Sequence, residues 1–287
     1  MKVSIVSWEK YNWRPFGSRG SSMIRARWLA EKWDEASEWS HGDRFDAIIL
    51  QKVYWMDIVK DFKGVKILDM CDPDWMRGQE TSCRLVEIAQ YIDAITCSTD
   101  ALTEVIKGII KHIPVITIPD RLNMDYFTVK KQHTETAKSA VWFGYFHKAN
   151  QLLNHVIPSL KKRNLSLYVV SNSEFVPDTD YGVEISNIMW TPNNAFMDIQ
   201  SGDFVINPGS PFGDPRFKSN NKTLIAWALG MPVASTADDM DRFLDPKERQ
   251  KESELRQKEI IEQHDIKLSI KQYQDLICTI QKKKGSK

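Results

Sequence analysis

The sequence predicts an α/β protein made of two open parallel-sheet units that follow one another along the chain. Short apolar stretches alternate with helical stretches, a pattern typical of strands buried on both faces of a parallel sheet. The alternation stops in the polar segment 128–138, which we interpret as a linker, and then starts again. A length of 287 residues is enough for two domains of ordinary size.

The first unit is expected to alternate strands and helices from the N-terminus to about residue 118. The predicted strands are 2–7, 46–50, 65–70, 94–97 and 115–118. Helices are predicted at 21–33, 81–91 and 99–110, the last with Ser98 or Thr99 as its N-cap. Ile24, Trp28 and Leu29 recur at helical spacing and should form the buried stripe of the first helix.

The second unit repeats this alternation. The predicted strands are 140–143, 165–170, a short strand within 184–190, 204–206 and 233–235. Helices are predicted at 150–163, 193–200 and 219–229. A charged helix at 246–262 should be solvated, and a last helix should start at Asp265 or Ser269, before a frayed lysine-rich tail.

Ligands in open parallel sheets bind at the carboxyl ends of the strands. The loops after Ser7, Met70, Phe143, Trp190 and Ile206 are therefore expected to line one cavity.

Composition excludes several classes of protein. The net charge of +1 predicts no strong overall attraction to nucleic acid or membranes. The four cysteines form no CxxC pair, which argues against a zinc site or a disulfide framework and for a reducing, cytoplasmic location. No apolar run approaches the ~20 residues that span a bilayer, and no signal peptide precedes the first strand.

The stretch 207–235 carries the strongest functional signal. It predicts a strand end, a long glycine- and proline-rich loop, a helix with Ser219 as N-cap, and a turn with Gly230 at the C-cap before Pro232. Asn221 and Lys222 would occupy the first helical turn, and Lys218 would precede it. Free backbone N–H groups, the helix dipole and two ammonium groups together predict a diphosphate site. The alternative is a surface helix with a polar first turn.

The two-unit layout and two segments resemble glycosyltransferases of the GT-B fold. The segments are 142–149 (WFGYFHKA) and 221–233 (NKTLIAWALGMPV), the second ending in the Gly-x-Pro-Val turn that follows the donor-binding helix. The resemblance implies two Rossmann-like domains facing across a cleft, with an acceptor domain at 1–134 and a nucleotide-sugar donor domain at 135–264. It also implies that a helix in 265–287 crosses back to the first domain, and that no metal or other cofactor is needed.

The same resemblance assigns the donor site. Gly144 and Tyr145 would let the chain approach the diphosphate, and the backbone near Ile188 would meet the nucleobase. A UDP-sugar is the expected donor. The residues implied at this site are Gly144, Tyr145, Lys148, Met189, Trp190, Gly209, Lys218, Ser219, Asn221, Lys222 and Thr223. The retaining family has two glutamates where this chain has Phe217 and Ile225, so retaining chemistry does not follow.

An inverting transferase needs a base for the acceptor hydroxyl. Asp72 and Asp74 follow a predicted strand, and we interpret Asp72 as the base, with Glu9 and His41 as weaker candidates. Alternatively these aspartates cap a turn or helix. A further alternative is the GT-A fold, in which Asp72 and Asp74 would ligate a divalent metal.

The acceptor is the most open part of the prediction. The loop 13–27 and nearby aromatic residues offer groups that bind phosphate or stack on bases, and the candidates are Trp13, Arg14, Arg19 and Trp75. The same loop is equally consistent with a glycine-rich turn into a solvated basic helix. A compact chain of this kind resembles short phage-type enzymes that glycosylate hydroxymethylpyrimidines in DNA, and a saccharide acceptor is the other expectation.

Two other classes of function are consistent with the sequence. A sugar-nucleotide epimerase or hydrolase of the same fold would act on the donor without an acceptor. A non-catalytic protein that binds nucleotides or nucleic acid would show no turnover. The sequence leaves the sugar, the stereochemistry and the oligomeric state open.

Overall fold

The computed structural model describes residues 1–11, 20–40, 42–77, 79–191, 194–208 and 215–286. These residues form two compact units. The first contains Met1–Asn123, Arg216–Ser219 and His264–Lys287, and the second contains Met124–Pro215 and Asn220–Gln263. Each unit is built on its own parallel sheet, as the alternation of strands and helices predicts.

The first unit has a six-stranded parallel sheet with the order β2-β1-β3-β4-β5-β6. Its strands are β1 (Val3–Ser7), β2 (Ala36–Glu38), β3 (Ala47–Gln51), β4 (Val65–Met70), β5 (Ala94–Cys97) and β6 (Val115–Thr117). Val6, Leu50, Leu68 and Ile95 are in register across four strands and all belong to one buried core. The sequence analysis missed β2, because only Ala36 of its three residues is buried.

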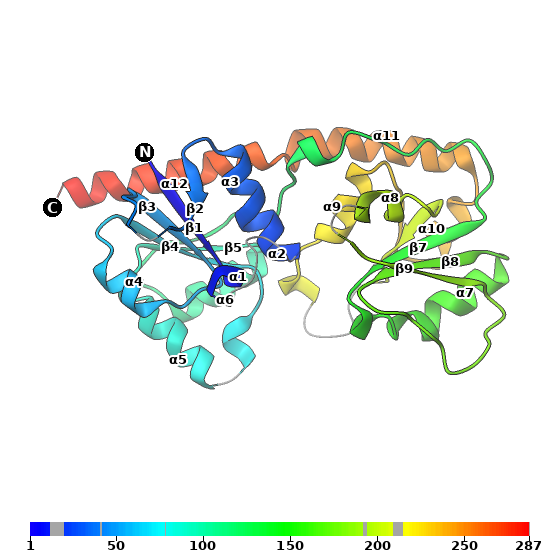
Figure 1. Ribbon diagram of the computed structural model, residues 1–287, viewed down its shortest axis with the longest axis horizontal. Coiled ribbons are helices and arrows are strands. Elements are labelled where there is room, and N and C mark those ends of the chain that lie inside the picture. Colours follow the sequence, from blue (N-terminus) through cyan, green and yellow to red (C-terminus); the bar gives the residue numbers. More distant parts are fainter. Residues whose placement is uncertain (12–19, 41, 78, 192–193, 209–214, 287) are drawn as a thin grey trace. The chain divides into compact units, whose positions relative to one another are not determined.

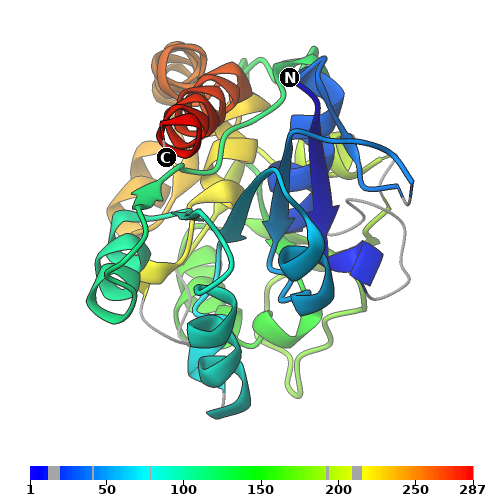
Figure 2. The same cartoon turned by 90° about the vertical axis from the view of Figure 1, so that its left-hand side faces the viewer.

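Helices cover both faces of this sheet. The helices α4 (Met56–Asp61), α5 (Gln79–Ile88) and α6 (Asp100–Ile109) lie on one side, as Figures 1 and 2 show. The opposite side carries α3 (Trp28–Lys32) and the C-terminal α12 (Ile266–Gly285). Thr99 is the N-cap of α6, where its hydroxyl accepts a hydrogen bond from the Leu102 N–H, as predicted.

The predicted helix 21–33 is interrupted in the middle. It consists of α2 (Gly20–Ser22), a π-helical stretch at Met23–Arg27, and α3, while α1 (Trp8–Tyr11) precedes it. The predicted stripe of Ile24, Trp28 and Leu29 is buried. The π-helical stretch contains Arg25, whose buried side chain is described below.

The second unit has a five-stranded parallel sheet with the order β11-β10-β7-β8-β9. Its strands are β7 (Ser139–Gly144), β8 (Ser166–Ser171), β9 (Ile185–Met189), β10 (Phe204–Ile206) and β11 (Val233–Ala234). One side is covered by α7 (Ile157–Lys162), and the other by α8 (Ala195–Ile199), α9 (Asn221–Ala228) and α11 (Pro246–Gln263) (Figure 1). The short α10 (Ala237–Arg242) follows β11 and begins with a Thr236–Asp239 capping box.

The prediction that α11 is fully solvated is wrong. Arg249, Glu252, Ser253 and Ile260 are buried, and the Arg256 guanidinium lies 4.4 Å from the centre of the Trp227 ring on α9. Charged side chains can be buried here because each finds polar partners. Arg249, for example, donates to the carbonyl oxygens of Glu135, Phe243 and Leu244.

The linker segment also binds to the second unit through a buried histidine. The Nε2–H of His133 donates to the carbonyl oxygen of Gly230 at 2.8 Å, and Nδ1 accepts from Arg249 Nε at 3.3 Å. These contacts require a neutral ring protonated at Nε2. Burial, followed by the positive charge of Arg249, lowers the pKa of His133.

The His133 contacts predict a loss of stability in acid. The unfolded chain takes up this proton near the ordinary histidine pKa of about 6.5, while the folded protein does so at lower pH. Between the two pKa values the unfolded chain binds more protons, so this contribution to stability is lost as pH falls below about 6.5. His133→Gln should flatten this part of the pH dependence of the urea midpoint. An identical pH dependence in the variant would contradict the prediction.

The last helix returns to the first unit, which confirms the predicted crossing. The Leu122 N–H donates to the carbonyl oxygen of His264, and the Leu122 carbonyl oxygen accepts from the Ile266 N–H. Asp265 is the N-cap of α12. Tyr273 of α12 stacks on Trp33 with ring centroids 6.5 Å apart. Lys284 donates to the Asp93 carboxylate at 2.8 Å near the end of the helix.

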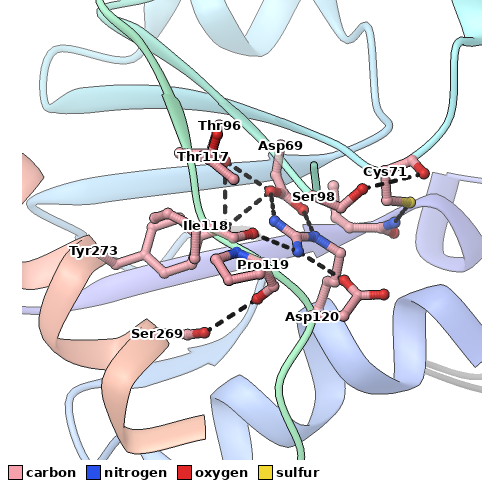
Figure 3. Close-up of polar contacts among 12 residues, drawn as sticks. Asp69, Cys71, Thr96, Ser98, Thr117, Ile118, Pro119, Asp120, Ser269 and Tyr273 are labelled. Carbon is pink, nitrogen blue, oxygen red and sulfur yellow. Dashed lines mark hydrogen bonds and ion pairs between the residues drawn. The ribbon is translucent and has the colours of Figure 1, made fainter. Parts of the chain in front are cut away.

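A buried polar network holds α12 beneath the carboxyl end of β4 (Figure 3). Arg25 makes two hydrogen bonds to the Asp69 carboxylate, at 2.6 and 2.8 Å, and one to Asp120 at 2.7 Å. Asp69 Oδ1 also accepts from the hydroxyls of Thr96 and Tyr273, at 2.7 and 2.9 Å. Burial opposes the charge on Arg25, but the carboxylates outweigh it and raise its pKa. The network therefore joins the π-helical stretch Met23–Arg27, the sheet and α12.

Candidate functional site

The carboxyl end of the second sheet presents three strand ends side by side. Gly144 of β7, Ser171 of β8 and Met189 of β9 are in register. Tyr145 and Trp190 follow two of these strands, with 46% and 39% of their surfaces exposed. The Trp190 N–H donates to the Ser171 carbonyl oxygen, so the chain around the predicted nucleobase contact is fixed by backbone bonds.

The helix α9, which the resemblance assigns to the donor site, begins later than predicted. Its first residue is Asn221 and its N-cap is Asn220, whose side chain makes no capping hydrogen bond, so the prediction of Ser219 as N-cap is wrong. The reason is that Arg216–Ser219 belong to the first unit, where Phe217 packs against the core. Thr223 accepts a hydrogen bond from Asn207 at 3.1 Å, which joins the first turn of α9 to the end of β10.

Lys222 lies at the start of α9 and is held by aromatic rings. Its Nζ is 4.8 Å from the centre of the Trp142 ring and 5.8 Å from that of Phe143. Within the described ranges, Lys222 makes no hydrogen bond and no ion pair with a carboxylate. Burial, and then the charge of Lys148, lowers its pKa to about 8. The structure thus brings together Gly144, Lys148, Lys222 and the first turn of α9. The Lys222 ammonium has no carboxylate partner in the part of the chain that the structure describes.

The buried charge of Lys222 has no carboxylate partner among the described residues, so it should reduce the stability of the protein when no ligand is bound. The folded pKa of about 8 lies below the ordinary 10.5, so the unfolded chain binds more protons between these values. The penalty is therefore complete below pH 8 and disappears as pH rises towards 10.5. We expect Lys222→Met to stabilise the empty protein by up to about 3 kcal/mol at pH 7 and by much less at pH 10.

Urea unfolding at both pH values measures this difference. Lys162→Met on α7 is a matched control, because Lys162 is exposed to solvent and its replacement should change little. A Lys222→Met protein that is less stable than the wild type at pH 7 would show that the rings compensate the charge.

Lys218 and Ser219 lie in the first unit, apart from the α9 residues with which the sequence analysis grouped them. Lys218 Nζ donates to Asp72 Oδ1 at 2.5 Å. Gly209, the remaining predicted donor residue, lies outside the described residues. The predicted donor residues thus divide into one group at the second sheet and a Lys218–Asp72 pair in the first unit.

The predicted catalytic pair lies just beyond the end of β4. Asp72 Oδ2 accepts from Lys52 Nζ at 2.7 Å, and the same ammonium is 3.8 Å from Asp74 Oδ2. Burial alone would raise the pKa of Asp72, but Lys52 and Lys218 outweigh it and lower the pKa. Asp72 is therefore an ionised carboxylate between two ammonium groups.

The sequence analysis missed Lys52. It directly follows β3, has a φ of 57°, and its N–H donates to the carbonyl oxygen of Asp69. A non-glycine residue in the left-handed region costs energy, and such residues cluster at functional sites. The only feature of the sequence that could have indicated Lys52 is its position shortly after a predicted strand. Burial lowers its pKa, while the acidic groups of Cys71, Asp72 and Asp74 outweigh this effect and raise it.

The other predicted residues are less informative. Trp13, Arg14, Arg19 and His41 lie outside the described residues, as does the side chain of Trp75. Glu9 lies in α1 and is buried. No group of three or more potential ligand side chains is arranged to hold a metal ion in the described part of the chain.

Comparisons with known proteins identify the fold. The structure of HepE from Anabaena with UDP and glucose matches with a TM-score of 0.66 and 10% identity, over 97% of this chain and 100% of that one. TarM matches with a TM-score of 0.62 and 13% identity, over 80% of this chain. The catalytic domain of starch synthase IV from Arabidopsis thaliana, bound to ADP and acarbose, gives 0.53 and 10%, over 95% of this chain and 78% of that one.

This chain covers 54% of TarM, so it spans about half the length of that protein. No protein-family model matches the sequence. No significant relative is found among curated proteins. In the described residues, no helix has the length and apolar character that crossing a bilayer requires.

The chain therefore has the GT-B fold, with two Rossmann-like domains, as the resemblance implied. The GT-A alternative, which depended on Asp72 and Asp74 as metal ligands, is wrong, because the chain forms two successive parallel-sheet units of the GT-B fold. Asp72 and Asp74 pair with lysine in this fold.

Proposed function

We propose that this protein is a glycosyltransferase that moves a sugar from a nucleotide-diphosphate sugar to an acceptor hydroxyl. The observation that carries the proposal is Lys222, a cation without a carboxylate partner among the described residues, at the first turn of α9 in a GT-B fold. Backbone N–H groups at a helix start and a nearby ammonium group suit a diphosphate. They would stabilise the charge that develops on the leaving nucleotide.

The other residues of the second sheet complete a donor site in this proposal. Gly144, Tyr145 and Lys148 meet the phosphates from the β7 side, and Asn221 and Thr223 meet the phosphates or the ribose from α9. Met189 and Trp190 meet the nucleobase at the end of β9. UDP-sugars are the first donors to test, because HepE and TarM structures of this fold contain UDP, and one HepE structure contains UDP-glucose.

Asp72 is the proposed base for the acceptor hydroxyl. Its ionised state supports this role, because a base must be unprotonated at the start of the reaction. Lys52 and Lys218 hold the carboxylate, at 2.7 and 2.5 Å, and would orient it. The acceptor is a saccharide or a hydroxymethylpyrimidine in DNA.

A thermal-shift screen with UDP-, GDP-, ADP- and CMP-sugars tests the proposal. A ligand that binds the folded state alone must raise the melting temperature, by an amount that grows with its concentration over Kd. Lys222→Met should lose most of the shift, while Lys162→Met should keep it. A screen without any shift would rule out the donor site.

Product analysis then separates the alternatives. The best donor is incubated with a saccharide panel and with hydroxymethylated and unmodified duplex DNA. Sugar on the acceptor supports a transferase, altered or hydrolysed donor without acceptor supports an epimerase or hydrolase, and binding without turnover supports a non-catalytic protein.

A further inference from the structure

The ammonium group of Lys222 lies against two aromatic rings, of which Trp142 is the nearer, and beside one glycine. We infer that Trp142 and Gly144 are positioning residues that hold Lys222 away from every carboxylate among the described residues, so that a donor diphosphate binds with uptake of a proton. This inference rests on the proposed function, which supplies the diphosphate. It adds Trp142 and a proton to the donor site, and it gives Gly144 a positioning role.

Trp142 supplies the surface on which the ammonium lies. The tryptophan is 1% exposed and belongs to the core of the second unit, so its ring cannot follow a moving lysine. The Lys222 Nζ is 4.8 Å from the ring centre, within the range of a cation–π contact. Such a contact attracts the cation but contributes less than a carboxylate would. The charge therefore remains available for an anion.

Gly144 supplies the space. A Cβ at this position would lie 2.5 Å from Lys222 Nζ and 3.1 Å from two atoms of the Trp142 ring, Cη2 and Cζ2. Contacts this short force a displacement, and the flexible end of the lysine is the part that can move. The backbone of Gly144 does not have a positive φ, so the glycine is needed here for room rather than for backbone conformation.

The charges around Lys222 explain the proton. Lys148 is the charged group among the described residues that acts on it, and it repels the ammonium. No carboxylate opposes this repulsion in the described residues, and with burial it lowers the pKa of Lys222 to about 8. A diphosphate beside Lys222 would favour the protonated form again. By linkage, donor affinity must then fall as pH rises above about 8.

Isothermal titration of the full chain with UDP-glucose tests the inference. The diphosphate of this probe is fully ionised in the range used, and Lys222→Arg controls for titration of its uracil ring at the alkaline end. We expect Kd to rise about tenfold between pH 7 and pH 9, since Lys222 titrates near 8. Titrations at pH 8 in buffers of different ionisation enthalpy should show about half a proton taken up per ligand.

Variants separate the positioning role from general damage. Gly144→Ala should raise Kd at pH 7 about tenfold and weaken the pH dependence, because the added methyl displaces the ammonium. Gly108→Ala is the control, since a Cβ there meets nothing within 4 Å. Trp142→Phe keeps an aromatic face and should retain the pH dependence. Lys222→Arg should bind at pH 7 and lose the pH dependence, because arginine stays charged.

The outcomes are distinct. A Kd for UDP-glucose that is equal at pH 7 and 9, with Gly144→Ala binding like the wild type, overturns the inference and leaves the proposed function intact. No binding of UDP-glucose at any pH overturns the inference together with a UDP-sugar donor site. Tighter binding of UDP-glucose at pH 7 than at pH 9 in the wild type, with equal binding at the two pH values in Lys222→Arg, supports it.

Discussion

Arg25→Met is expected to destabilise the first unit by roughly 3–5 kcal/mol, because it leaves buried carboxylates without their cation. Arg25 is 3% exposed, and its partners Asp69 and Asp120 are 0% and 1% exposed. Methionine fills much of the arginine volume but donates no hydrogen bond. The two carboxylates and the Ile118 carbonyl oxygen, which Arg25 also binds at 2.8 Å, would all lose a donor.

Urea unfolding and amide hydrogen exchange measure this effect. Exchange should accelerate most in α12, because Tyr273 shares Asp69 with Arg25. Arg84→Met is the matched control: Arg84 pairs with Glu80 on α5, but both are exposed, and its loss should cost under about 1 kcal/mol. An Arg25→Met protein with wild-type stability would show that the network is not needed to hold the fold.

A double substitution separates the pair from its parts. Asp69→Asn alone leaves Arg25 with Asp120, whereas Arg25→Met with Asp69→Asn removes both charges. The double variant should lose less than the sum of the single variants, because residues in one network are not additive. Additive losses would mean that Arg25 and Asp69 act independently, against the contacts of 2.6 and 2.8 Å between them.

Local patterns made much of the fold predictable. Gly230 was predicted at a helix C-cap, and it directly follows Leu229, the C-cap of α9, with a φ of 78° that side chains rarely adopt. Strand 204–206 agrees with β10 in both of its ends. These features depend on neighbours in the sequence, so a single sequence contains the information that decides them.

The polar networks could not be predicted, because their members are distant in sequence. Arg25 meets partners 44 and 95 residues away, and Lys218 meets Asp72 at a separation of 146 residues. The start of α9 was misplaced for the same reason, since Phe217 packs against a core formed by other segments. The capping propensity of Ser219 depends on the local sequence alone and does not include that contact.

For the candidate site, residue types were informative and partners were not. Glycine at 144 and lysine at 222 were both assigned to the donor site, yet nothing in the sequence places Trp142 under the ammonium. Lys52 was missed because a lysine after a strand is common. Its significance lies in the 2.7 Å contact to Asp72, which requires the fold.

Asp72→Asn is expected to lower kcat for sugar transfer by roughly 10²–10⁴-fold while Kd for the donor changes little. Asparagine has nearly the same shape, but its single oxygen can accept from only one of the two lysines, which donate to different oxygens of Asp72. The amide cannot take a proton from the acceptor. A base acts in the chemical step and leaves donor binding to the second sheet. Single-turnover assays together with donor titrations measure the two effects separately.

Asp74→Asn is the matched comparison, because Asp74 lies 3.8 Å from the same lysine ammonium and should matter less. Equal losses of kcat in both variants, or a loss of donor affinity in Asp72→Asn, would argue for an electrostatic role of the pair. Retention of full transfer activity in Asp72→Asn would remove Asp72 from the mechanism.

The pH profile provides the sharper test, because Lys52 and Lys218 lower the pKa of Asp72. A base must be ionised, so kcat/KM should fall as pH decreases through this lowered pKa. In Lys52→Met one of the two ammonium groups is lost, the pKa rises, and activity should fall at a higher pH than in the wild type. If kcat/KM of Lys52→Met falls at the same acidic pH as that of the wild type, the titrating group is not Asp72. If the fall in kcat/KM occurs at a higher pH in Lys52→Met, and is absent from the residual activity of Asp72→Asn, Asp72 is the base.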